Sequence, residues 1–137
     1  MLFEYKIEGG DFTMAGVASS QVKKTLKQLG VDSAVIKRVV VALYEAEVNV
    51  VAHAYRGVIY VDIKGDGIKL RLEDEGPGIP DVSLAMTKGF STASSAVREM
   101  GFGAGMGLPN ISDNADFFSI ETDVGKGTTL HIEIKFR

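Results

Sequence analysis

The segment from about Ser33 to Tyr55 constrains the fold of this chain more than any other stretch. Apolar residues recur at helical spacing around most of its circumference, and Gly57 follows as a stop signal. A helix of that kind is buried on most sides. Its most apolar part, residues 39–54, is too short and too charged to span a membrane. We therefore expect a core helix.

Polar side chains interrupt this apolar helix. Glu45, Asn49 and His53 are spaced four residues apart, so they share one stripe beside the apolar one. Glu47 lies about 200° round the helix from Glu45, and we expect Glu47 to face solvent. An unpaired buried carboxylate is costly, and a hydrated Mg²⁺ held by oxygen ligands would compensate it. Taken alone, the segment favours a partly exposed Glu45, an Asn49 in a local hydrogen bond and a structural His53.

The order of the other predicted elements indicates an α+β domain. Strands are expected near residues 2–8, 58–64, 68–74, 117–122 and 128–136, and shorter helices near 13–29 and 107–115. Asp11 or Thr13 is expected to cap the first helix, and Gly30 to end it. We expect a single domain over residues 1–137, a two-layer sandwich with helices on one face of a mixed, largely antiparallel sheet.

Strand parity singles out two polar residues. Residues 68–74 and 128–136 alternate between faces, with apolar side chains at the even positions. Because side chains of a strand alternate faces, Asp74 and Thr128 are predicted to point inward with the apolar set. A carboxylate there could accept a hydrogen bond from the exocyclic amine of adenine, supported by the hydroxyl. The alternative is that both residues cap turns.

Glycines mark the segment that follows Asp74. Gly76 and Gly78 come at alternate positions, and residues 101–108 have a glycine at every second place before a predicted helix. Such loops allow close approach to a flat ligand and present backbone N–H groups to phosphate. Neither a Walker loop nor a Rossmann fingerprint is present. We expect an ATP lid at about 80–106, with a mobile linker as the alternative. Lys88 or Arg98 could meet phosphate oxygens there, although polar runs of this kind are more often solvated surface.

The bulk composition excludes several classes of function. The chain has no cysteine, which excludes disulfides and thiolate metal sites. Its net charge of −3 gives no basic footprint for nucleic acid. The N-terminal residues lack a basic segment followed by an apolar run, so no signal peptide is expected. We therefore expect a cytoplasmic protein that contacts neither membrane nor nucleic acid directly.

Four short motifs together resemble the Bergerat-fold (GHKL) ATPase/kinase superfamily. Residues 45–49 resemble its N box, 74–78 its first glycine box, 101–108 its second and 125–128 its third, in the order of the family. The N box, extended to Tyr55, is most similar to that of the anti-sigma regulatory serine/threonine kinases. The resemblance implies the fold of that superfamily, with ATP and Mg²⁺ as cofactors.

The resemblance also implies a role for each motif residue. Glu45 would be the catalytic base and Asn49 the Mg²⁺ ligand, while Asp74 would read adenine with Thr128 close by. The remaining cofactor-binding residues would be Gly76, Gly78, Ile79, Gly103, Gly105, Gly107 and Leu108.

The partner implied by the resemblance is an antagonist-type (anti-anti-sigma) protein, phosphorylated on serine in bacterial transcription or stress control. A sigma factor as a second partner and a homodimer are further expectations of the same origin. The alternative is a nucleotide-gated protein-binding switch without kinase activity.

Overall fold

The structure, a computed structural model, describes residues 1–86 and 107–137 of the chain. Within these two ranges, five strands form one sheet in the order β1-β2-β3-β5-β4. The strands are β1 (Leu2–Glu8), β2 (Arg56–Lys64), β3 (Gly67–Glu75), β4 (Phe117–Asp123) and β5 (Gly127–Lys135). The helices are η1 (Phe12–Met14), α1 (Val17–Gln28), α2 (Ser33–His53), α3 (Val82–Ala85) and α5 (Gly107–Asn114).

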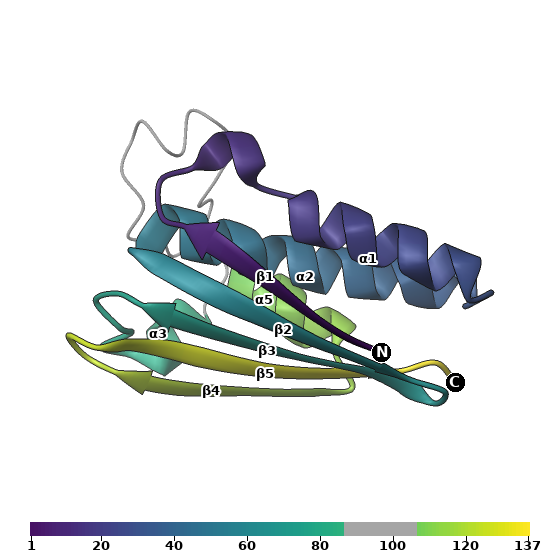
Figure 1. Ribbon diagram of the computed structural model, residues 1–137. Coiled ribbons are helices and arrows are strands. Elements are labelled where there is room, and N and C mark those ends of the chain that lie inside the picture. Colours follow the sequence, from purple (N-terminus) through teal and green to yellow (C-terminus); the bar gives the residue numbers. More distant parts are fainter. Residues whose placement is uncertain (87–106) are drawn as a thin grey trace.

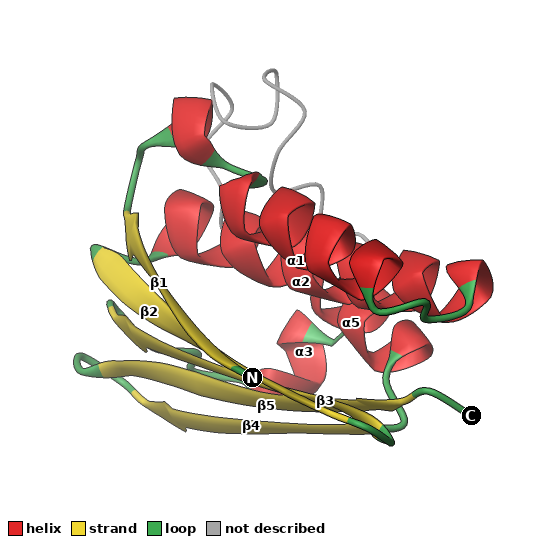
Figure 2. Cartoon of the chain, turned by 45° about the vertical axis from the view of Figure 1, so that its right-hand side comes forward, coloured by secondary structure: helices red, strands yellow, loops and turns green. Residues whose placement is uncertain are grey.

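Helices α1, α2 and α5 form one layer over a single face of the curved sheet (Figures 1 and 2). The expected α+β two-layer sandwich is therefore confirmed. All of the strand pairings between described residues are antiparallel, so the sheet is more regular than the mixed sheet we expected.

The core lies between the sheet and α2. Ile59 on β2 stands opposite Leu72 on β3, which stands opposite Leu130 on β5, and all are buried. Leu43 and Ala46 of α2 belong to the same buried cluster. Since α2 also contacts α1 and α5 in the helical layer, its sequence is apolar on most sides. In the part of the chain that the structure describes, no helix is both long and apolar enough to cross a membrane.

Helix α1 begins later than the sequence suggests. Neither Asp11 nor Thr13 caps it; the Thr13 hydroxyl instead donates to Asp11 across 2.7 Å, beside the short helix η1. The chain then turns at Gly16, whose φ of 95° is strained for any residue with a side chain, and α1 starts at Val17. Gly30 follows the helix as expected, with a bond from the Val31 N–H to the Leu26 carbonyl across 3.1 Å.

Glu47 is the clearest departure from the sequence-based expectations. Its side chain is only 2% exposed, so the expectation that it faces solvent is wrong. Its carboxylate accepts hydrogen bonds from the backbone N–H groups of Gly16, Ala18 and Ser19 at 3.0, 3.2 and 2.7 Å. Helix α1 covers that side of α2, and its unpaired N-terminal N–H groups compensate the buried charge.

Candidate functional site

The polar stripe on α2 meets the first turn of α5. A Cβ atom at Gly107 would lie 3.4 Å from Glu45 Oε2, at ordinary van der Waals contact, so the first residue of α5 lies directly beside the carboxylate. Asn110 Nδ2 donates to Glu45 Oε1 across 3.4 Å. Glu45 and Asn49 are both half-buried and lie one helical turn apart. The stripe therefore packs against α5 at Glu45, and both Glu45 and Asn49 remain partly accessible to solvent.

Asp74 and Thr128 both face the helical layer, as strand parity predicts. They are cross-strand partners at the ends of β3 and β5, and the Thr128 N–H donates to Asp74 Oδ1 across 3.0 Å. Thr128 is buried and Asp74 is half-buried. Burial raises the pKa of the Asp74 carboxyl, and the bond from Thr128 opposes that rise.

The loops that follow β3 and β4 are joined by backbone hydrogen bonds. Gly76 N–H donates to the Lys126 carbonyl across 3.1 Å, and Gly125 N–H donates to the Pro77 carbonyl across 2.8 Å. Gly127 has a φ of 153°, and a Cβ atom there would lie 2.0 Å from the Asp74 carbonyl oxygen. Only glycine fits that position. The first and third glycine motifs of the sequence therefore form one contiguous structure around Asp74.

The C-terminal half of α2 lies over this structure. A Cβ atom at Gly57 would touch Val50 at 3.0 Å and the Asp74 side chain at 3.4 Å. Similarly, a Cβ atom at Gly76 would lie 3.0 Å from the backbone of Ala54. The strand end that carries Asp74 therefore sits directly beneath the helix that carries Glu45 and Asn49.

The structure does not place every predicted residue at the candidate site. Gly103, Gly105, Lys88 and Arg98, and most of the expected lid at 80–106, lie outside the described residues. Leu108 is buried in the hydrophobic cluster, a packing role that the sequence did not assign to it. His53 is half-buried, and burial lowers its pKa.

Sequence reasoning missed two residues that contact the candidate site. Asn110 reaches Glu45, and the Thr122 hydroxyl accepts a hydrogen bond from the Ile79 N–H across 2.8 Å. Asn110 lies two residues beyond the second glycine motif, and nothing in the motif or in its charge marked it as a site residue. Thr122 lies in a strand without clean alternation, so only the register between β4 and β5 reveals it.

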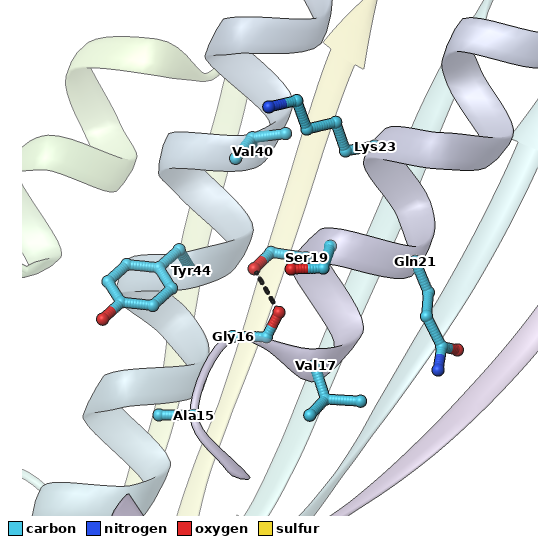
Figure 3. Close-up of a pocket in the computed structure, with 9 residues that line it drawn as sticks. Ala15, Gly16, Val17, Ser19, Gln21, Lys23, Val40 and Tyr44 are labelled. Carbon is cyan, nitrogen blue, oxygen red and sulfur yellow. Dashed lines mark hydrogen bonds between the residues drawn. The ribbon is translucent and has the colours of Figure 1, made fainter. Parts of the chain in front are cut away.

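A separate groove of about 580 Å³ lies between the N-terminal part of α1 and the middle of α2. Figure 3 shows Tyr44 and Val40 on one wall and Lys23 on the other. The Ser19 hydroxyl, which also lines it, donates to the Gly16 carbonyl across 3.1 Å. Among the residues that the structure describes, none of the candidate site lines this groove.

Comparison with known proteins places this geometry in context. Residues 13–134 match the family described as Histidine kinase-like ATPase domain. Serine/threonine-protein kinase RsbT of Bacillus subtilis (strain 168) is 34% identical over 119 residues, which cover 83% of this chain and 84% of that protein. Anti-sigma F factor of Geobacillus kaustophilus (strain HTA426) is 31% identical over 139 residues, covering 96% of this chain and 87% of that protein.

A solved structure supports the fold independently. The mycobacterial sensor histidine kinase MprB superimposes with a TM-score of 0.53 at 17% identity, covering 97% of each chain. At this identity the likeness concerns the fold alone.

Proposed function

The chain belongs to the family of histidine kinase-like ATPase domains, and we propose from that premise that it is a serine/threonine protein kinase that uses Mg-ATP to phosphorylate an antagonist-type protein. The observation that carries this proposal is the placement of Glu45. Its carboxylate stands one turn before Asn49 on α2 and against Gly107 at the start of α5.

At the adenine end, Asp74 is the residue that reads the base. Among the bonds that link described residues, Asp74 accepts through Oδ1 from Thr128, and Oδ2 is the oxygen left for an exocyclic amine. A carboxylate accepts hydrogen bonds but cannot donate them when ionised, so it favours adenine over guanine, which presents a carbonyl there. Gly76 and Gly78 let the backbone approach the flat base.

The donor set near Asn49 fits a magnesium ion that is held mainly by phosphate. No cluster of three or more acidic, histidine or cysteine residues that could hold a metal occurs in residues 1–86 and 107–137. Mg²⁺ prefers oxygen ligands, keeps several waters and often takes only one or two ligands from the protein. Asn49 would supply one amide oxygen, and the bound ion would neutralise charge on the phosphates.

The chemistry expected of the protein is limited to proton transfer and positioning. Glu45 takes the proton of a partner's serine hydroxyl while the serine oxygen forms a bond to the γ-phosphorus. The bond from that phosphorus to the bridging oxygen breaks, and ADP leaves. Phosphoryl transfer depends mostly on such positioning and on charge stabilisation. Gly103 and Gly105 complete the proposed phosphate loop, and residues 80–106 the proposed lid of this single domain.

Two relatives support the choice of partner. One is named a serine/threonine-protein kinase, and the other an anti-sigma F factor. We therefore assign an anti-anti-sigma-type protein as the substrate, and we include a sigma factor and a second copy of this chain as further partners. Control of bacterial transcription or stress responses would follow from these contacts.

The test is incubation of the chain with labelled ATP, Mg²⁺ and a candidate antagonist domain. We expect label on a serine of the partner with the wild type, and none with Glu45→Ala. Asn49→Ala and Asp74→Asn should each weaken Mg-ATP binding. ATP binding without transfer to any cognate partner would replace the kinase by a nucleotide-gated switch. Unchanged ATP affinity in both binding variants would overturn the site.

A further inference from the structure

A row of polar residues crosses the inner face of the sheet at the end where the site lies. Asp74 on β3 is paired with Thr128 on β5, and Thr128 is paired with Thr122 on β4. The next inward-facing row consists of Leu72, Leu130 and Ile120, which are apolar. On the other side of Asp74 stands Gly57, where Val50 of α2 packs close to the backbone in place of a side chain. The polar row is therefore distinct from the rest of the inner face, because the neighbouring row is apolar.

Thr122 is the end of that row and its most connected member. Its hydroxyl oxygen accepts from the Ile79 N–H at 2.8 Å and lies 3.0 Å from Thr128 Oγ1, where either hydroxyl can donate. The hydroxyl can also donate to the Gly127 carbonyl oxygen across 3.3 Å. The three contacts join β4 to the loop after β3 and to the start of β5. Thr122 is thus hydrogen-bonded to both segments that flank Asp74.

The direction of these hydrogen bonds follows from counting protons. The Ile79 N–H can only donate, so Thr122 Oγ1 accepts there, and Thr122 has one proton left to donate. When that proton goes to Thr128 Oγ1, at the shorter distance, the Thr128 proton turns away from Thr122. Thr128 then offers a donor next to the acceptor Asp74. When the proton goes to Gly127 instead, Thr128 must donate back to Thr122 and offers an acceptor.

A donor beside an acceptor is the pattern that matches adenine. The Watson–Crick edge of adenine carries an amine donor next to the N1 acceptor, whereas guanine carries a carbonyl acceptor next to an N1–H donor. We propose that Thr122 is a positioning residue for adenine recognition, which holds the Thr128 hydroxyl as a donor, directly or through one water, beside the Asp74 carboxylate. This inference rests on the proposed ATP site and adds a residue that does not touch the nucleotide.

Thr122→Val tests the inference, because valine keeps the shape and removes the hydroxyl, and Thr122→Ser is the matched control that keeps it. We expect Thr122→Val to raise the Kd for ATP about 5- to 30-fold, which lies within the range for leaving a buried polar group without its hydrogen-bond partner. The Kd for GTP should change by less than about 3-fold, so the preference for ATP over GTP falls. In the kinase assay the KM for ATP should rise while kcat stays close to the wild-type value. The serine variant should resemble the wild type.

A second probe separates the two polar groups. Purine riboside triphosphate keeps N1 and lacks the amine. Thr122→Val should weaken this analogue by the same factor as ATP, whereas Asp74→Asn should weaken ATP more than the analogue. If the valine variant does not fold, Thr122→Ala takes its place. The ratio of the Kd values for two nucleotides is measured on folded protein, so a modest loss of stability does not change it.

Equal weakening of ATP and GTP by Thr122→Val would mean that the hydroxyl only braces the loop, and unchanged binding would mean that it does nothing; either result overturns the inference. A wild-type chain that binds no nucleotide would overturn the proposed function itself, so the two failures are distinguishable.

Discussion

The Glu47 carboxylate on α2 accepts a 2.7 Å hydrogen bond from the backbone N–H of Ser19 on α1. Gly16 and Ala18 donate to the other oxygen of the same carboxylate. Helix α1 has no side-chain cap of its own and no acidic residue in its first turn. Glu47, from the neighbouring helix, therefore acts as the N-cap of α1, and its hydrogen bonds link the two helices at a buried position.

We predict that Glu47→Gln destabilises the protein by about 2–4 kcal/mol, since bonds to a buried charge are strong and an amide places a donor against N–H donors. Chemical denaturation measures the change in the free energy of unfolding. Glu4→Gln, on the exposed side of β1, is the matched control and should change it by less than about 0.5 kcal/mol. Equal stability of the Glu47 variant and the wild type would contradict the assigned bonds.

Asp74 gives a prediction about ATP binding and pH. Its pKa is raised by burial, and only the ionised carboxylate accepts from the adenine amine without offering a proton. ATP affinity should therefore fall as the pH drops from neutral toward the raised pKa. Asp74→Asn should bind ATP about 10- to 100-fold more weakly at neutral pH, in line with a buried bond to a charged group. Titration calorimetry at several pH values measures both effects.

The raised pKa of Asp74 affects stability in the opposite direction: stability falls as the pH rises, whereas ATP affinity falls as the pH drops. Because the pKa is higher in the folded state, the folded chain binds more protons in the window above the usual value of 3.8, so stability falls as the pH rises through it. Asp74→Asn removes this loss and keeps an oxygen for Thr128. It should match or exceed the wild type in stability at neutral pH, while Asp66→Asn in the exposed β2–β3 turn should change neither property. Unfolding of the Asp74 variant would weaken its use as a binding probe and contradict this argument.

The sequence alone could identify the strands that carry the site. Periodicity of two put Asp74 and Thr128 on the inner face, and the structure places them there as cross-strand partners. The same kind of reasoning located Glu45 and Asn49 on one stripe of α2. The faces on which these residues lie depend on the periodicity of one helix or strand, and a single segment of sequence is enough to show it.

Features that depend on a second segment could not be predicted in this way. Glu47 is buried because α1 begins at Val17, after the turn at Gly16, and directs its N–H groups at the carboxylate. Helical periodicity round α2 says nothing of where α1 begins. Likewise, Thr122 enters the polar row through its pairing with Thr128, and the strand residues before it do not alternate cleanly enough to reveal that register.

His53 predicts how stability responds to mild acid. Burial lowers its pKa below the usual value of 6.5, so the unfolded chain binds the proton first as the pH falls. Stability should therefore decline as the pH drops from 6.5 toward the lowered pKa, with a slope of at most about 1.4 kcal/mol per pH unit from this group. Denaturation curves between pH 7.5 and 5 measure the slope. His53→Gln should flatten it more than His131→Gln on the outer face of the sheet; an equal effect of both variants would contradict the role of burial.

Asn110 gives a prediction about the rate of transfer. Its Nδ2 donates to Glu45 Oε1 across 3.4 Å, and it lies one turn into α5, next to the proposed base. Loss of this bond should leave the Glu45 carboxylate free to rotate, so Asn110→Ala should lower kcat by about 2- to 10-fold, the range for one modest hydrogen bond. The Kd for ATP should stay within about 2-fold of the wild type, because the bond orients the base and does not hold the nucleotide.

Ser112→Ala, at an exposed position of the same helix, is the matched control and should change neither value. Single-turnover phosphotransfer together with ATP titration measures both quantities, and a variant that loses ATP affinity while keeping its kcat would show that Asn110 shapes the nucleotide site instead of the base.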